Sequence, residues 1–245
     1  SCRKVFIMSF LSSEKGDSIK EVWQNILDDC ASDTVFLTPH WQEIWWNRFN
    51  EGQEIFLKII CHNAQDLGVV PLLLHQKELT FIGDSNLFDY MDFPHRRGNE
   101  TPFFKALWDL ILPLDWKIMR LESIPEDSAT LKYLKDMSLR EGYKVNCVES
   151  DKTPFIELPQ SWDDYLSGLR KKDRHELRRK IRRLANNVEF RQTRYDASSN
   201  NLEESMECFF QLMSMSSLGK KEFLEAGRKR FFIEIVFDLS KRSQL

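Results

Sequence analysis

The densest run of charged side chains in the sequence extends from Arg170 to Arg183. It holds nine Lys or Arg in fourteen residues, opposed only by Asp173 and Glu176. Guanidinium and ammonium groups bind phosphates, so the run predicts an anion site for a nucleotide-linked substrate, coenzyme A or RNA. A solvated helix face is the alternative, because like charges one turn apart repel unless water or anions surround them. The candidate substrate- or phosphate-binding residues are Arg170, Lys171, Lys172, Arg174 and Arg178.

A second group of reactive side chains lies between Gly83 and Arg97, a stretch with no regular period that we expect to form a long loop. Two carboxylates, a phenol and the His95 imidazole fall within seven residues, which suits general acid–base chemistry. The candidate catalytic residues are Asp89, Tyr90 and Asp92. The alternative is that the Asp residues only shape turns.

Several other chemistries lack their motifs. The five cysteines are scattered with no C-x-x-C pair, and the histidines have no ligand spacing, so we expect no metal site and no disulfide framework. No P-loop, G-x-G-x-x-G or G-x-S-x-G pattern occurs. No apolar run is long enough to cross a membrane. A reducing, cytoplasmic location fits this cysteine usage.

Composition indicates a globular chain with two different surfaces. Of the 245 residues, 42% are hydrophobic and 30% charged, which excludes a disordered chain. Residues 1–150 carry 16 Lys or Arg against 23 Asp or Glu, a net charge of −7, and residues 151–245 carry 19 against 15, a net of +4. The overall charge of −3 argues against a general nucleic-acid binder.

The pattern before Pro159 predicts an α/β (α+β layered) domain over residues 1–158. Apolar residues at helical spacing predict helices over 18–29, after Thr38 with Pro39 at the first position, over 101–112 and up to Arg140. Strands are predicted over 1–12, 54–62, 68–75, 78–82, 116–122, 143–148 and 153–158. Pro71 lacks a backbone N–H, so we expect a bulge or a sheet edge there.

Pro159-Gln160-Ser161 predicts a domain boundary, and residues 159–245 would form a second, incomplete domain. Ser161 caps a helix about six turns long whose apolar positions run from Leu166 to Leu184. A strand over 188–193 and helices over 202–218, closed by Gly219, and over 223–239 follow. A single strand cannot stand alone, so we expect part of this domain to lie beyond Leu245.

The motifs, taken together, resemble a known family. They are Phe36-x-x-Pro39-x-Trp41-x-x-x-Trp45, Gly68-Val69-Val70-Pro71-Leu72, Phe81-Ile82-Gly83 with Tyr90-x-Asp92, Ser161-Trp162-x-x-Tyr165-Leu166, Lys171-Lys172-x-Arg174 and Leu177-Arg178-Arg179-Lys180. In order and spacing they resemble CelD-like acetyltransferases of the GNAT superfamily, which are associated with cellulose or exopolysaccharide biosynthesis. Those proteins are similar to Fem-type peptidyl transferases with two tandem GNAT-like domains.

The resemblance implies a GNAT-like mixed sheet flanked by helices, followed by an incomplete second GNAT-like domain. It implies an N-acyltransferase that uses acetyl-CoA or another acyl-CoA and acts on a small amine or sugar-linked acceptor in polysaccharide or envelope biosynthesis. The coenzyme A site would lie beyond Leu245. Two other functions stay open. The basic segment 170–183 would serve an RNA- or aminoacyl-tRNA-binding module, or the chain would be a non-catalytic remnant that binds a partner.

Overall fold

The computed structural model describes residues 13–187, 189, 192–196, 198–199, 201–225 and 227–245. The expected strand over 1–12, and half of the one over 188–193, lie outside these residues. The chain divides into two compact units, Ser1–Cys147 with Ala197–Leu245 and Val148–Asp196. The division expected at residues 158 and 159 stays a prediction.

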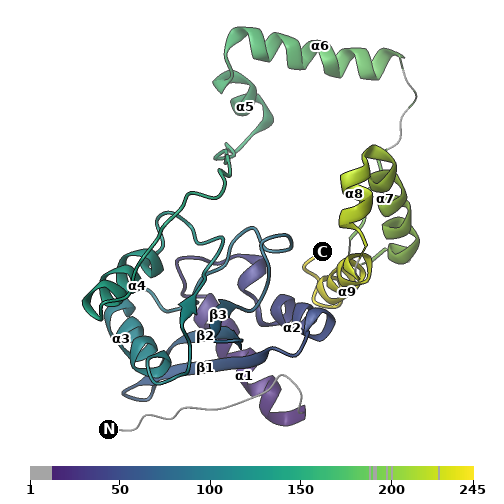
Figure 1. Ribbon diagram of the computed structural model, residues 1–245. Coiled ribbons are helices and arrows are strands. Elements are labelled where there is room, and N and C mark those ends of the chain that lie inside the picture. The colour runs from purple at the N-terminus through teal and green to yellow at the C-terminus, as the bar shows by residue number, and fades with distance from the viewer. Residues whose placement is uncertain (1–12, 188, 190–191, 197, 200, 226) are drawn as a thin grey trace. The chain divides into compact units, whose positions relative to one another are not determined.

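The first unit is built on a mixed four-stranded sheet in the order β1-β2-β3-β4 (Figure 1). The strands are β1 (Glu54–His62), β2 (Gln65–His75), β3 (Glu78–Phe81) and β4 (Ile118–Met119). β1, β2 and β3 pair antiparallel, and β4 pairs parallel with β3. The α/β class is therefore confirmed.

Two-residue turns join the first three strands. Asn63 and Ala64 have φ angles of 50° and 64°, and Gln76 and Lys77 have 47° and 67°. Positive φ at both central residues is the type I′ geometry, whose twist matches that of the flanking strands. These short turns fix the register of the meander.

Helices cover both faces of the sheet. Val69 and Val70 are neighbours in β2 but belong to different buried clusters, as alternation along a strand requires. The Val69 cluster includes Trp23 of α1 (Ser13–Leu27), and the Val70 cluster includes Phe103 of α3 (Glu100–Ile111). The sheet is thus the middle layer of the unit.

Side-chain caps start the helices that follow Thr38 and Ser128. The hydroxyl of Thr38 accepts a hydrogen bond from the Trp41 N–H at the start of α2 (Pro39–Phe49), which follows the short 3-10 helix η1 (Val35–Leu37). Ser128 accepts from the Thr130 N–H at the start of α4 (Ala129–Arg140). The predicted cap at Thr38, with Pro39 at the first position, is confirmed.

Three later helices belong to the first unit as well. They are α7 (Leu202–Ser216), α8 (Leu218–Phe223) and α9 (Arg228–Lys241). Phe231 of α9 is fully buried, and its ring lies 5.5 Å from Trp41 and 5.7 Å from Phe49 of α2. Arg48 of α2 also pairs with Glu234 of α9.

The second unit contains α5 (Trp162–Gly168) and α6 (Lys171–Asn187). The Ser161 hydroxyl accepts from the Asp164 N–H at 3.1 Å, which confirms the predicted cap. The single helix of six turns is wrong, because the chain is extended at Leu169. At the end of α5, three backbone carbonyls accept hydrogen bonds from the Arg174 guanidinium rather than from the backbone N–H groups of a further helical turn.

Three expected strands are corrected. The one over 116–122 is reduced to Ile118–Met119, and the ones over 143–148 and 153–158 are not formed. A strand needs a neighbour for its backbone hydrogen bonds, and neither of these last two segments pairs with one. Tyr143 instead stacks on Trp116 at 4.9 Å, and Phe155 is 85% exposed.

The bulge expected at Pro71 is also wrong, because the register shifts at Ile60 and Cys61 instead. Pro71 pairs directly with Leu57 in a central strand, and its carbonyl accepts from the Ile82 N–H at 3.0 Å. The N–H and carbonyl of a strand residue point to the same side, so the bond that Pro71 cannot make is the reciprocal one to Ile82, just past the end of β3 at Phe81. The missing donor thus affects only the end of the β2–β3 ladder, and β2 needs no bulge there.

The ends of two later helices differ from the prediction. The helix over 202–218 ends at Ser216, since the Ser217 hydroxyl accepts from the Lys220 N–H and starts α8. Gly219 lies inside α8 and does not close α7. The helix over 223–239 begins at Arg228, after Gly227 at a φ of 82°.

Candidate functional site

The predicted loop over residues 83–97 is confirmed as a segment without helix or strand, and it lies along β2. The Val69 N–H donates to the Pro94 carbonyl, and the Arg96 N–H donates to the Leu67 carbonyl, both at 2.8 Å. These bonds continue the ladder of β2 past the end of β3. The loop therefore has a fixed position, and each of its candidate side chains can be placed.

Asp92 lies in the interior and is 2% exposed. Its carboxylate accepts from the Ser128 hydroxyl at 2.7 Å, from the Phe93 N–H at 2.8 Å, from the Thr130 hydroxyl, and at 3.4 Å from Ser32. Ser128 and Thr130 open α4, so Asp92 joins the loop to the start of that helix. Hydrogen bonds of this kind offset the free-energy cost of burying a carboxylate.

The other two candidates have different surroundings. Asp89 is exposed, and Tyr90 is half-buried with its ring 6.4 Å from Phe36. His95 is buried, its Nδ1 lies 2.7 Å from the Phe93 carbonyl, and its ring stacks on Phe103 at 5.2 Å. Asp89 and Tyr90 thus remain accessible to solvent, whereas His95 packs in the core.

Sequence reasoning overlooked Cys30, a buried thiol beside this loop. Burial raises the pKa of Cys30, and the charge of Asp92 raises it further, although backbone N–H groups such as that of His95 lower it. The thiol stays protonated at neutral pH, which does not favour a nucleophile. The Arg97 guanidinium donates to the Cys30 carbonyl at 3.0 Å, so it binds the backbone of this chain rather than a ligand.

Glu100 is the first residue of α3. Its own N–H and that of Gly98, whose nitrogen lies 2.9 Å from Oε1, lower the pKa of Glu100. Negative charge at the N-terminus of a helix is favourable. This carboxylate therefore stabilises α3, and nothing in its contacts points to catalysis.

The five candidate cations of the basic run fall into two groups. Arg170 pairs with Asp173 at 2.8 Å, and Arg174 donates to the Leu166, Ser167 and Leu169 carbonyls. Lys171, Lys172 and Arg178 are exposed. These three cations suit an external anion, whereas Arg174 mainly caps α5.

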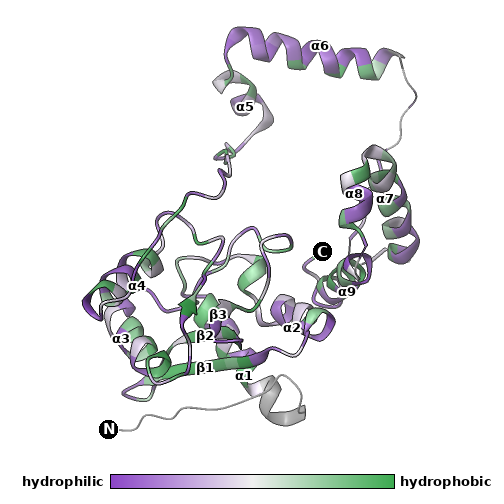
Figure 2. Cartoon of the chain, viewed as in Figure 1, coloured by the Kyte–Doolittle hydropathy of each residue, from purple (hydrophilic) through white to green (hydrophobic). Residues whose placement is uncertain are grey.

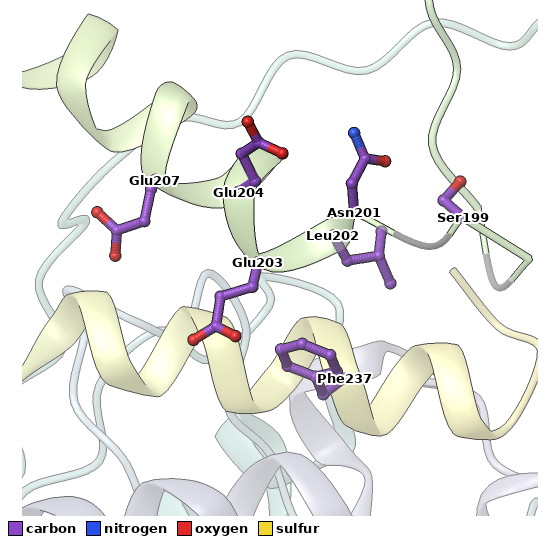
Figure 3. A pocket seen from close by; sticks show the side chains of 7 residues that line it. All are labelled: Ser199, Asn201, Leu202, Glu203, Glu204, Glu207 and Phe237. Atoms are coloured by element: carbon purple, nitrogen blue, oxygen red, sulfur yellow. The ribbon is translucent and has the colours of Figure 1, made fainter.

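A hollow that the sequence did not indicate lies beside the start of α7. It has a volume of about 750 Å³, and its lining includes Glu203, Glu204 and Glu207 together with Phe237 of α9. Figure 3 shows Glu203 extending from α7 toward α9, beside Phe237. Carboxylates are common in the first turn of a helix, where they complement its dipole, so Glu203 and Glu204 did not stand out in the sequence.

No group of three or more metal-ligating side chains occurs among the described residues. None of the described helices combines the length and apolarity that a membrane span requires. Comparison with protein-family models, with curated proteins and with solved structures finds no match.

Proposed function

We propose that this chain is part of an acyl-CoA-dependent N-acyltransferase. The observation that supports the proposal is the order of elements in the first unit. Two helices, α1 and α2, precede an antiparallel meander of three strands, and a helix then leads to a strand parallel to the last of them. This order agrees with the GNAT-like mixed sheet flanked by helices that the resemblance implies.

The proposal concerns transfer of an acyl group from a thioester to an amine. The new C–N bond forms as the C–S bond breaks, the amine loses a proton, and coenzyme A leaves as a free thiol. The acceptor would be a small amine or a sugar-linked amine in polysaccharide or envelope biosynthesis. A cytoplasmic location and the GNAT-like second domain belong to the same proposal.

The contacts of β4 support a cofactor site outside the first unit. β3 and β4 pair only at Glu78 with Ile118 and Leu79 with Met119. Past this pair the Arg120 N–H still donates to Leu79, but the carbonyl of Ser123 accepts from the Met91 N–H of the loop at 2.9 Å. Met91 is 4% exposed, so a buried residue of the loop lies beside the segment that follows β4.

The proposal is tested by incubating the natural full-length protein with acetyl-CoA and a panel of amines and amino sugars. We expect release of coenzyme A thiol that depends on the amine, together with an N-acylated product detected by mass spectrometry. The matched control is the N-acetylated form of each acceptor, which has no free amine. No thiol release above background with acetyl-, propionyl- or succinyl-CoA would contradict the proposal.

A further inference from the structure

The helix α6 carries an apolar stripe as well as its cations. Leu177, Ile181 and Leu184 lie at positions i, i+4 and i+7, which form one face of a helix. Ile181 is 46% and Leu184 is 48% exposed. Figure 2 shows α6 as a mostly hydrophilic ribbon interrupted by short hydrophobic bands. The described part of the chain thus leaves this stripe in contact with solvent.

The cations divide into two sets by their angle around the helix. At about 100° per residue, Arg178 lies about 60° from Ile181 on one side of the stripe, and Lys180 lies about 40° from Leu184 on the other side. Lys172 and Arg179 lie at least about 120° from every residue of the stripe. Two cations therefore flank the stripe, and two others point away from it.

The carboxylates of α6 neutralise the flanking cations only in part. Glu176 pairs with Arg179 at 2.7 Å and with Lys180 only at 3.8 Å, and Asp173 pairs with Arg170. Arg178 is exposed and forms no ion pair with a carboxylate among the described residues. Positive charge beside the apolar stripe is thus available to an external anion.

We propose that α6 binds in the plane of a membrane surface that carries anionic phospholipids. Its apolar stripe would enter the headgroup boundary, and Arg178 and Lys180 on either side of the stripe would contact lipid phosphates. A basic amphipathic helix of this kind, here about 25 Å long, is the established form of an interfacial helix. This surface is separate from the transferase activity proposed above.

The apolar residues favour lipid over RNA. Phosphates of RNA would neutralise the cations but would leave Ile181 and Leu184 exposed to water. Trp162 of α5 adds to the same argument, because it is 55% exposed and stacks on Tyr165 at 5.4 Å. Trp and Tyr are the residues that concentrate at membrane–water interfaces. A lipid surface offers phosphates to the cations and an apolar boundary to the exposed apolar and aromatic side chains.

The test is co-sedimentation of the full chain with vesicles of 70% phosphatidylcholine and 30% phosphatidylglycerol, compared with pure phosphatidylcholine. Variant one is Arg178→Gln with Lys180→Gln. Variant two, the matched control, is Lys172→Gln with Arg179→Gln on the same helix. Variant three is Ile181→Ser with Leu184→Ser. Far-UV circular dichroism shows whether each variant keeps its helix content.

We expect binding to the anionic vesicles only, a loss of about 30-fold in affinity for variant one and a much smaller loss for variant two. Variant three should lose about 10-fold or more. Equal losses in variants one and two, or unchanged binding of variant three, would overturn the proposal. So would tighter binding of single-stranded RNA than of vesicles, with RNA affinity unaffected in variant three, because RNA would then be the partner.

Discussion

Two carboxylates three residues apart in the same loop have opposite surroundings. Asp92 is buried and accepts hydrogen bonds from Ser128, Thr130, Phe93 and Ser32, whereas Asp89 is exposed. Removing an acceptor leaves several buried donors without a partner, and each unsatisfied donor costs free energy. Asp92 therefore stabilises the folded chain, and Asp89 is the carboxylate of the two that a substrate can reach.

We expect Asp92→Ala to lower the free energy of unfolding by about 3 kcal/mol. The matched change Asp89→Ala should stay within about 0.5 kcal/mol of the unchanged chain, as is usual for an exposed site. Urea unfolding followed by tryptophan fluorescence measures both. Similar midpoints for the two variants would show that the hydrogen bonds of Asp92 do not support the loop.

At the scale of elements, a glycine lets α3 and the loop approach β2. A Cβ at Gly68 would lie 2.6 Å from Cδ2 of Phe103 and 2.7 Å from the Pro94 carbonyl oxygen. Phe103 is fully buried, so its ring has little room to move. The absence of a side chain at Gly68 thus sets the distance between the sheet, the helix and the loop.

Gly68→Ala should lower the free energy of unfolding by about 2 kcal/mol, because it overpacks this contact. Gly219→Ala is the control, since nothing lies within 4 Å of a Cβ there and Gly219 is in α8. The control should raise stability by about 0.5 kcal/mol through helix propensity. Thermal unfolding compares them, and a neutral Gly68→Ala would mean that α3 can shift at little cost.

At the scale of the first unit, distant parts of the chain share one core. Phe231 of α9 packs on Trp41 and Phe49 of α2, almost two hundred residues earlier in the sequence. The same buried cluster includes Phe88, Phe93 and Phe104. Contacts of such long range tie the stability of the C-terminal helix to that of the sheet.

Phe231→Ala should therefore cost about 4 kcal/mol, the range of a large cavity in a core. Phe209→Ala makes the same chemical change on α7, where the side chain is 53% exposed, and should cost less than about 1 kcal/mol. Both values come from denaturant unfolding. If Phe231→Ala were as mild as Phe209→Ala, α9 would not belong to the core.

Local patterns were enough to predict the elements whose signals lie within their own sequence. The helix capped by Thr38, the helix start at Ser161 and the strand from Glu54 to His62 are confirmed. Their caps, apolar spacing and β-branched residues act over a few positions. The candidate residues of the loop were found from their types alone, but types could not separate Asp92 from Asp89.

The sequence by itself determined the α/β class, the loop over 83–97 and the charge of α6. Only the tertiary structure decided what depends on neighbours distant in the chain. The segments 143–148 and 153–158 have strand-like residues but no pairing partner, and Pro71 is accepted in a central strand because β3 ends beside it. The role of Asp92 follows from hydroxyl groups 36 and 38 residues later, whose approach no local pattern encodes. Strand pairing and burial are long-range properties, and this is the physical reason for the difference.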